Sequence, residues 1–311
     1  MTRTGVISNE TWARIEPLLP SSAGRRGGRW RDHRQVVEAV AWRYRTGSPW
    51  RDLPESFGPW QTAWKRLDRW TRDGTWERLL CVVQADADAL GELDWMTSID
   101  SSVVRAHQHA AGARRRPRRT RGAPSNDKKS AGSQDQQDRN AADQALGRSR
   151  GGLSTKLHLA VDGRGRPLAA LVSAGQAGDN PALPSLLEAI AVARPGRGRP
   201  RRRPDHLIAD KAYSHPSTRR LLRRRGIRHT IPERDDQRAR RRLRGARGGR
   251  PPAFDAETYK RRNVVERCIN RLKQWRGVAT RYDKKACNYR SGVLLAALLL
   301  WHASTDLRDT P

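Results

Sequence analysis

The sequence predicts a mixed α/β protein in which an all-helical segment precedes a sheet flanked by helices. Eight of the eleven tryptophans fall within residues 12–76, where apolar residues recur with helical spacing. From residue 94 onward, short apolar strands alternate with helices. We therefore expect a helical domain over residues 1–90 and an α/β domain over residues 91–110 and 147–305.

The segment between the two parts of the α/β domain, residues 111–146, breaks this pattern. It is rich in Arg, Gly, Ser, Gln and Asp and poor in apolar residues, which predicts a flexible basic linker or insertion. Two further basic stretches, residues 193–205 and 234–252, interrupt the domain. They are either solvated loops or segments that contact phosphate groups.

The helical domain is predicted to begin with two helices. The first lies in ISNETWARIEPLLP, with Asn9 or Thr11 near its cap, and the second lies in RDHRQVVEAVAWRYRTG and ends at Gly47. Two short helices, SPWRDLPESFG and PWQTAWKRLDRWTRDG, then flank a tight turn at residues 57–59. This arrangement is typical of a helix-turn-helix.

The last of these helices carries polar side chains that could reach DNA. The candidates are Gln61, Thr62, Lys65 and Arg66. The alternative is a plain helical bundle in which the tryptophans form the core, because helix-turn-helix patterns also arise by chance.

The α/β domain is predicted from its alternating apolar residues and its turn signals, such as the hairpin turn at Asp162 and Gly163. We expect, in chain order, a strand, a hairpin, a helix, a strand, a helix, a strand and a final helix. These elements lie at residues 94–106, 153–175, 180–194, 206–214, 217–227, 227–233 and 259–277.

Charge and cysteine content restrict the function classes. The chain has 311 residues, and 63 basic against 32 acidic residues give a net charge of +31, so nucleic acid is the leading partner. Three cysteines in no CxxC exclude a disulfide framework and a Cys-rich zinc finger, and they fit a reducing cytoplasm. No apolar signal core is present, and the longest apolar run, residues 293–301, is too short to span a bilayer, so we expect no membrane association.

The final predicted helix, YKRRNVVERCINRLKQWRG, contains seven Lys or Arg residues but a single acid, Glu266. On a helical wheel, Tyr259, Arg262, Asn270 and Lys273 fall within roughly 40° of Glu266, beside an apolar stripe. The simplest interpretation is an i,i+4 ion pair with Arg262, which contributes ~0.2–0.5 kcal/mol. A carboxylate at the edge of the buried face, in one row with cations, instead favours a functional site.

Two further acids lie on apolar strands. Asp100 sits inside SIDSSVV, and Asp210 ends LIAD. If the first and fourth strands are neighbours and the final helix packs across the sheet, both aspartates converge with Glu266 at one edge. Such hard oxygen ligands suit Mg²⁺ or Mn²⁺, and two such ions promote phosphodiester chemistry. The alternatives are a strand-end cap for Asp100 and an ordinary strand-to-helix turn for Asp210.

These residues carry a resemblance that covers nearly the whole chain. The segments SIDSSVVRAHQHAAGAR, LIADKAYS and RNVVERCINRLKQWRGVATRYDK, with the N-terminal pieces RIEPLLP and WRDLPESFG, resemble insertion-sequence transposases of the IS5 family. The most specific match is Tyr259-x2-Arg262-x3-Glu266-x6-Lys273, which is similar to the Y-x2-R-x3-E-x6-K signature of IS4- and IS5-type enzymes.

The resemblance implies an RNase H-like catalytic domain with a DDE triad, here Asp100, Asp210 and Glu266. It implies cleavage that depends on Mg²⁺, with Mn²⁺ able to substitute, at the terminal inverted repeats of the element. The freed 3′-hydroxyl then attacks target DNA. Arg262 and Lys273 would contact this double-stranded DNA, and Tyr259 would help to position it. We also expect a homodimer or higher oligomer on DNA, in the cytoplasm and associated with the nucleoid.

Other motifs are less specific. Lys156 in STKLHL could reach a phosphate or simply the surface. His107 and His109 form an HxH, which is a weak metal site without a third ligand, so a structural or DNA-proximal role is favoured. The segment GRSRGGLST lacks the GK[ST] of a P-loop, so we expect no nucleotide cofactor.

Two alternative functions remain at this point. A non-catalytic DNA-binding protein derived from a transposase would keep the helix-turn-helix and the charge without needing the three acids. A metal-dependent nuclease would use the acids to cut DNA without joining it.

Overall fold

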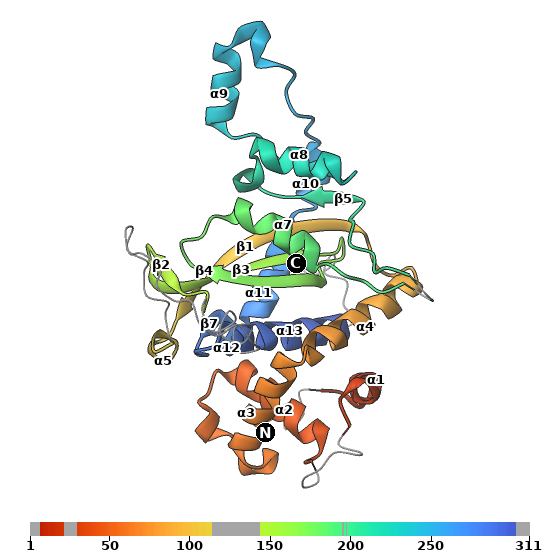
Figure 1. The fold of residues 1–311 in the computed structure, drawn as a ribbon, viewed down its shortest axis with the longest axis vertical. Coiled ribbons are helices and arrows are strands. Elements are labelled where there is room, and N and C mark those ends of the chain that lie inside the picture. Colours follow the sequence, from red (N-terminus) through yellow and green to blue (C-terminus); the bar gives the residue numbers. More distant parts are fainter. Residues whose placement is uncertain (1–6, 22–29, 114–143, 195, 197, 303–311) are drawn as a thin grey trace, which may run out of the picture.

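The computed structural model describes residues 7–21, 30–113, 144–194, 196 and 198–302. A helical N-terminal part lies at one end of the molecule, and a sheet with its covering helices forms the centre (Figure 1). The predicted linker, residues 111–146, lies largely outside the described residues.

The N-terminal part is helical wherever it is described. Asp32 begins α2 by accepting hydrogen bonds from the backbone amides of Arg34 and Gln35, and Gly47 ends it with a left-handed φ of 72°. The elements of this part are α1 (Asn9–Ile15), η1 (Glu16–Leu18), α2 (His33–Thr46), η2 (Trp50–Asp52), η3 (Glu55–Phe57), α3 (Trp60–Arg72) and α4 (Thr75–Ala89).

The segment between α2 and α3 differs from the expected short helix. It forms two separate 3₁₀ turns, η2 and η3, which Pro49 and Pro54 precede. Because proline lacks an amide hydrogen, Pro54 prevents one continuous helix here. The helices α2 and α3 nevertheless pack against each other on either side of these turns.

A mixed seven-stranded sheet forms the centre of the α/β part, in the order β2-β3-β1-β5-β6, with β4 also paired to β3 and β7 to β1. β1 runs antiparallel to β3 and parallel to β5. The first and fourth predicted strands are therefore neighbours, as expected. The strands are β1 (Met96–Ala106), β2 (Gly147–Ser149), β3 (Gly152–Val161), β4 (Pro167–Ala174), β5 (His206–Ile208), β6 (Arg228–Thr230) and β7 (Thr280–Arg281).

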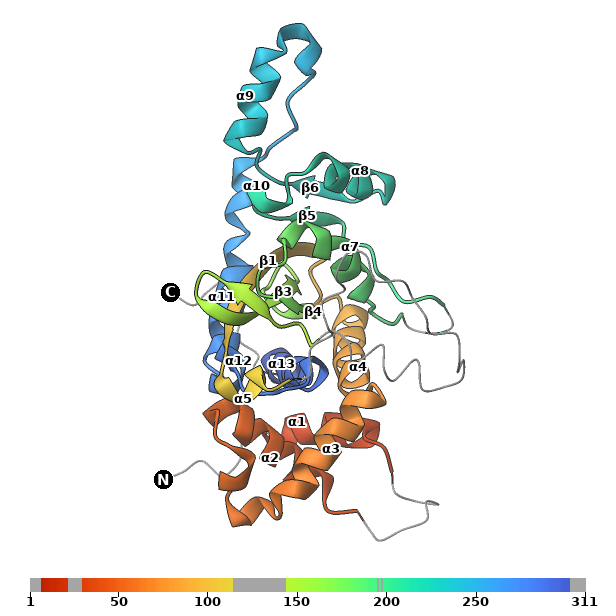
Figure 2. The ribbon, with the colours of Figure 1, turned by 60° about the vertical axis from the view of Figure 1, so that its left-hand side comes forward.

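Helices cover both faces of this sheet. Asp179 of α7 bonds to Ser101, whereas Arg262, just before α11, bonds to Asp100. Because successive side chains of a strand point to opposite faces, α7 and α11 lie on opposite sides (Figure 2). The helical elements here are α5 (Gln108–Ala111), α7 (Asp179–Ala189), η4 (Lys211–Tyr213), α8 (Pro216–Arg224), α9 (Asp235–Leu243), η5 (Gly245–Gly248), α10 (Ala256–Lys260), α11 (Asn263–Lys273), α12 (Arg276–Ala279) and α13 (Ala286–His302).

The basic stretch 234–252 contains regular structure that its composition did not predict. It folds into α9 and η5, which extend away from the rest of the molecule (Figures 1 and 2). Asp235 and Asp236 lie in the first turn of α9, where carboxylates favour a helix N-terminus.

The final predicted helix, residues 259–277, is divided in three. α10 ends at Lys260, a turn follows, and α11 begins at Asn263, before the short helix α12. The buried stripe starts at Val264, while α10 has no buried residue. α11 and α12 therefore pack onto the sheet, and Tyr259 on α10 does not share one continuous helix with Glu266.

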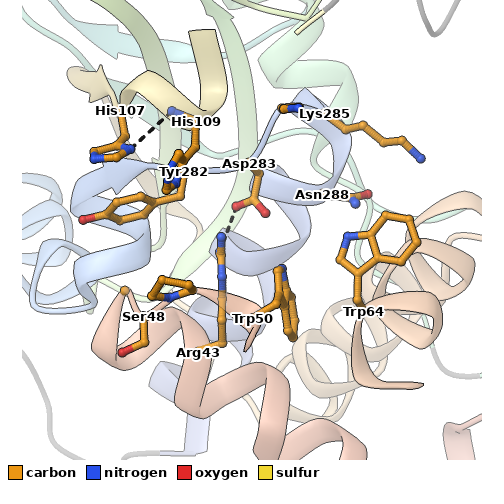
Figure 3. Close-up of a pocket in the computed structure, with 13 residues that line it drawn as sticks. Arg43, Ser48, Trp50, Trp64, His107, His109, Tyr282, Asp283, Lys285 and Asn288 are labelled. Atoms are coloured by element: carbon orange, nitrogen blue, oxygen red, sulfur yellow. Dashed lines mark hydrogen bonds and ion pairs between the residues drawn. The ribbon is translucent and has the colours of Figure 1, made fainter. Parts of the chain in front are cut away.

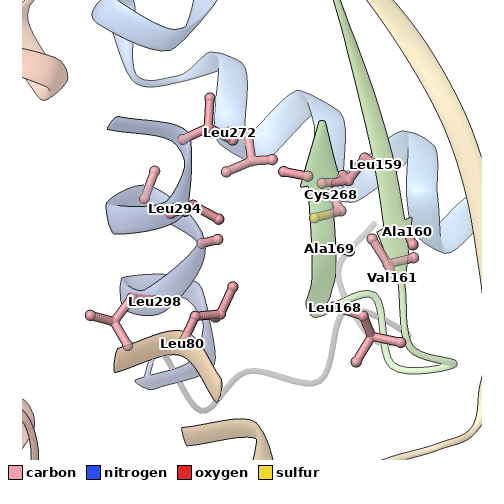
Figure 4. Close-up of a cluster of buried hydrophobic side chains, with 14 of the residues drawn as sticks. Leu80, Leu159, Ala160, Val161, Leu168, Ala169, Cys268, Leu272, Leu294 and Leu298 are labelled. Atoms are coloured by element: carbon pink, nitrogen blue, oxygen red, sulfur yellow. The ribbon is translucent and has the colours of Figure 1, made fainter. Parts of the chain in front are cut away.

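One buried apolar cluster runs from the N-terminal helices into the sheet. Leu80 of α4 lies beside Leu298 of α13, and Leu159 of β3 lies beside Cys268 of α11 (Figure 4). α13 contains the apolar run 293–301 and is buried along most of its length. Among the helices that the structure describes, none has the length and apolarity needed to cross a membrane.

Candidate active site

Asp100 and Asp210 meet at the edge of the sheet because of the parallel pairing of β1 and β5. Ser98 pairs with Ile208, so the two aspartates, each two residues further along, reach the same level. Asp210 caps η4 by accepting a hydrogen bond of 2.9 Å from the backbone amide of Ala212. Burial raises the pKa of Asp210 above its ordinary value, and the nearby charge of Asp100 raises it further.

Arg262 connects Asp100 to Glu266. It lies in the turn before α11, where its guanidinium donates to Asp100 Oδ2 at 3.1 Å and also forms an ion pair with Glu266. Burial would lower the pKa of Arg262, but the charges of Asp100 and Glu266 raise it. The expected i,i+4 pair is therefore present, and it extends to the strand carboxylate.

The two aspartates fit a divalent cation by ligand type. Two half-buried carboxylates side by side repel each other, and hard cations with oxygen ligands relieve such repulsion. Among the described residues, no three His, Cys, Asp or Glu side chains are grouped closely enough to hold a metal ion. In this arrangement Arg262 supplies the positive charge between Asp100 and Glu266.

Sequence reasoning missed a fourth carboxylate, Asp179. It lies in the first turn of α7 and accepts hydrogen bonds of 2.6 Å from Ser101 Oγ and 2.9 Å from Lys156 Nζ. Lys156, a candidate DNA contact, is thus held by Asp179 and by the Ala177 carbonyl at 2.6 Å. The only sequence signal was an acid at a helix start, and such acids are common because they favour the helix dipole.

Tyr213 also escaped the sequence analysis. It is 1% exposed, and its hydroxyl has no hydrogen-bond partner within the described part of the chain. Burial raises the pKa of this phenol well above its usual range, and the charges of Asp179, Asp100 and Asp210 add to the effect. The sequence DKAY places this ring three residues after Asp210, directly behind the site.

The other signature residues lie around these acids. Tyr259 packs against the exposed Phe254 in a tilted arrangement, with ring centroids 5.3 Å apart, and the Arg262 guanidinium lies 6.0 Å from the centre of the Tyr259 ring. Lys273 follows Glu266 by seven residues on α11, so it lies about 10 Å further along the same side of the helix. Tyr259 and Arg262 are thus brought together, while Lys273 is separate.

The candidate DNA contacts of the helical part all lie on α3. Gln61 and Lys65 are exposed, and Thr62 is partly exposed. Arg66 is only 6% exposed, donates to His33 Nδ1 at 2.9 Å and stacks on Trp70. Its position favours a packing role in this structure over a contact with DNA.

Comparisons with known proteins agree with this fold. A family described as "Transposase DDE domain" matches residues 92–301, and one described as "Putative transposase of IS4/5 family" matches residues 7–80. The chain belongs to the IS4/IS5-type DDE transposases, and it is therefore a DNA transposase with an RNase H-like catalytic fold. Enzymes of this family act on DNA and use divalent metal ions.

Individual relatives cover parts of the chain. It is 41% identical over 110 residues to an uncharacterised protein, y4sN, of Sinorhizobium fredii, which is 35% of this chain and 83% of the relative. It is 30% identical over 149 residues to the "Putative transposase for insertion sequence element IS6501" of Brucella ovis, 48% of this chain and 98% of the relative. The corresponding IS402 protein of Burkholderia cepacia is 34% identical over 132 residues, 42% of this chain and 55% of the relative. No solved structure matches the chain.

Proposed function

We propose that this transposase binds the terminal inverted repeats of its insertion sequence as double-stranded DNA, cleaves at the element ends and joins the freed 3′-hydroxyl to target DNA. The observation that carries the proposal is the convergence of Asp100 and Asp210 at one sheet edge, with Arg262 linking Asp100 to Glu266. The net charge of +31 suits a protein that covers DNA at this edge.

Asp100, Asp210 and Glu266 are the residues that would hold Mg²⁺, or Mn²⁺ in its place. A bound divalent ion supplies activation of the attacking water or 3′-hydroxyl and stabilisation of the leaving oxygen. The three carboxylates come from a strand, a strand end and a helix, so the sheet and α11 together fix their spacing. Asp179 keeps its hydrogen bonds to Lys156 and Ser101 and thereby ties α7 to β3 and β1.

Arg262, Lys273 and Tyr259 form the DNA side of the site in this proposal. Arg262 would exchange its carboxylate partners for the phosphate next to the cleaved bond, since a guanidinium forks onto either anion. Lys156 could also bind a DNA phosphate, but only if its ion pair with Asp179 breaks. Gln61, Thr62 and Lys65 on α3 would contact the terminal repeat within a DNA-binding domain of residues 1–90.

The assembly on DNA is part of the same proposal. An insertion sequence has two ends, and each end needs an active site near it. A homodimer or higher oligomer on the paired ends would supply them, with residues 91–110 and 147–305 forming each catalytic domain.

A cleavage and joining assay tests the proposed chemistry. The protein is incubated with DNA carrying the flanking inverted repeats, with Mg²⁺, Mn²⁺ or EDTA. We expect metal-dependent nicking and joined products, and Glu266→Gln should lower both by about 10³-fold or more while DNA affinity persists. Glu257→Gln is the matched control, because Glu257 is exposed on α10 and pairs only with Lys260 within the described contacts.

Three other outcomes of this assay would contradict the proposal. Tight binding without cleavage in either metal indicates a DNA-binding protein without catalysis. Cleavage without joined products indicates a nuclease. Cleavage that survives Glu266→Gln unchanged means that Glu266 is not one of the three metal-binding carboxylates.

A further inference from the structure

A pocket of about 460 Å³ lies where the helical part meets the start of α13, away from the three acids. Its walls come from segments far apart in the chain (Figure 3). The lining residues include the rings of Trp50, Trp64, His107, His109 and Tyr282 and the side chain of Lys284. The volume falls within the range of about 300–1,000 Å³ that is usual for pockets that hold small ligands.

Flat rings face this space from several sides. Trp64 is 36% exposed on α3, although large aromatic side chains are usually buried. The His107 ring lies 4.9 Å from that of Tyr282 and 4.5 Å from that of His109. Exposed ring faces around a pocket are the feature on which nucleobases stack, regardless of the base.

The base of the pocket carries a buried ion pair. Arg43 donates to Asp283 at 2.9 Å, and its guanidinium lies over the rings of Tyr44 and Trp50. Arg43 is 3% exposed, and its Nε has no hydrogen-bond partner among the described residues.

Positive charge surrounds the same space. Lys284 and Lys285 are both exposed and line the pocket, and Lys285 Nζ lies 5.8 Å from the Trp64 ring while pairing with Asp68. Rings beside ammonium groups suit a ligand that is flat at one end and anionic at the other. A nucleotide has this chemistry.

The pocket is also close to the proposed DNA path. Trp64 follows Gln61 by one helical turn on α3 and adjoins Lys65, both of which are exposed. His107 directly follows the end of β1, seven residues after Asp100, so this side of the pocket lies about 20 Å from Asp100. It is therefore not part of the catalytic edge.

We propose that this pocket binds one unpaired DNA nucleotide, with its base on Trp64 and its phosphate near Lys284. The inference rests on the proposed binding of terminal DNA by α3. It adds a site that senses an unpaired base in the DNA beside the repeat. It also gives His107, His109 and Tyr282 a DNA-proximal role.

The test compares two duplexes that carry the element end and differ only in one unpaired 2-aminopurine. Wild-type protein is expected to bind the duplex with the unpaired base about 5- to 50-fold more tightly and to quench the 2-aminopurine fluorescence. Trp64→Ala should abolish this preference and the quenching, and Trp64→Tyr should retain most of both. Lys284→Gln should reduce the preference, and Leu90→Ala, an exposed site elsewhere, should change neither.

The outcomes separate the pocket from the proposed function. Equal affinity of the wild-type protein for the two duplexes, or equal weakening of both by Trp64→Ala, overturns the pocket assignment. If neither duplex binds but a single strand with 2-aminopurine is quenched through Trp64, the pocket stands and terminal-DNA recognition fails. If that strand is not quenched either, the pocket assignment fails as well.

Discussion

Arg262 shows how one side chain can organise a site whose parts are distant in the sequence. It joins Asp100 of β1 to Glu266 of α11, and its own pKa rises because both carboxylates are close. The pKa of Asp210 is instead raised, by burial and by the negative charge of Asp100. At the scale of single residues, the site is thus held by charge pairs that a cation or a phosphate could rearrange.

The buried hydroxyl of Tyr213, close to these charged groups, can be tested by mutation. Its buried hydroxyl has no hydrogen-bond partner in the described part of the structure, so Tyr213→Phe removes an unsatisfied group. We expect DNA cleavage within about twofold of wild type and a melting temperature unchanged or raised by about 1–3 °C. Calorimetry and the cleavage assay measure these values.

Tyr44→Phe is the matched control for Tyr213→Phe. The Tyr44 hydroxyl is equally buried but donates to the Asn288 carbonyl at 2.7 Å, so its loss should destabilise by about 1–2 kcal/mol. A loss of cleavage in Tyr213→Phe at unchanged stability would show that the hydroxyl takes part in the reaction.

At the scale of elements, polar contacts fasten the helical part to α13. Asp68 of α3 accepts from Lys285 Nζ at 2.6 Å and from Asn288 Nδ2 at 3.3 Å. Tyr44 of α2 packs so closely against α13 that a Cβ on Gly292 would lie 2.1 Å from its ring. The position of α3, and with it Trp64, therefore depends on α13.

The Asp68 contact predicts a pH dependence. Burial would raise the pKa of Asp68, but the Lys285 ammonium and the Asn288 amide lower it below its ordinary value. A depressed carboxyl pKa contributes stability above the unfolded pKa of about 3.9 and loses it as pH falls through the folded value. Asp68→Asn should therefore cost about 1–2 kcal/mol at pH 7 and progressively less toward pH 3.

Chemical unfolding at several pH values between 7 and 3 measures this difference. Asp52→Asn, at an exposed site on η2, is the control and should track wild type throughout. Equal stability losses for Asp68→Asn at pH 7 and pH 3 would contradict an ionised role for Asp68.

At the scale of the whole molecule, charge and packing act in different places. A single buried cluster connects the N-terminal helices with the sheet, so the two parts share one apolar core. The chain has a net charge of +31, and α9, whose last turn is basic, extends beyond the core. A large DNA-facing surface is the expected consequence.

Such a surface predicts steeply salt-dependent binding. If 6–10 phosphates are neutralised, a plot of log K against log salt concentration should have a slope of about −5 to −9. Fluorescence anisotropy with a labelled element end measures this slope. Lys65→Gln should make it shallower by about one, and a slope near −1 for wild type would exclude an extended phosphate interface.

The sequence by itself determined the order of the main strands and helices of the α/β part and the family, and it predicted the three acids of the proposed site. Those signals are local: apolar periodicity marks which residues of an element are buried, and the signature spacing keeps Arg262 and Glu266 one turn apart. Asp100 and Asp210 could be paired because one lies within an apolar strand and the other directly follows one.

Only the tertiary structure decided the rest. The final predicted helix is divided before Asn263, and Arg66 is buried against Trp70. Asp179 forms an ion pair with Lys156, and a pocket forms beside Trp64. These features depend on contacts between residues far apart in the chain. Packing of whole elements decides such contacts, and local propensity does not encode which distant side chain completes a site.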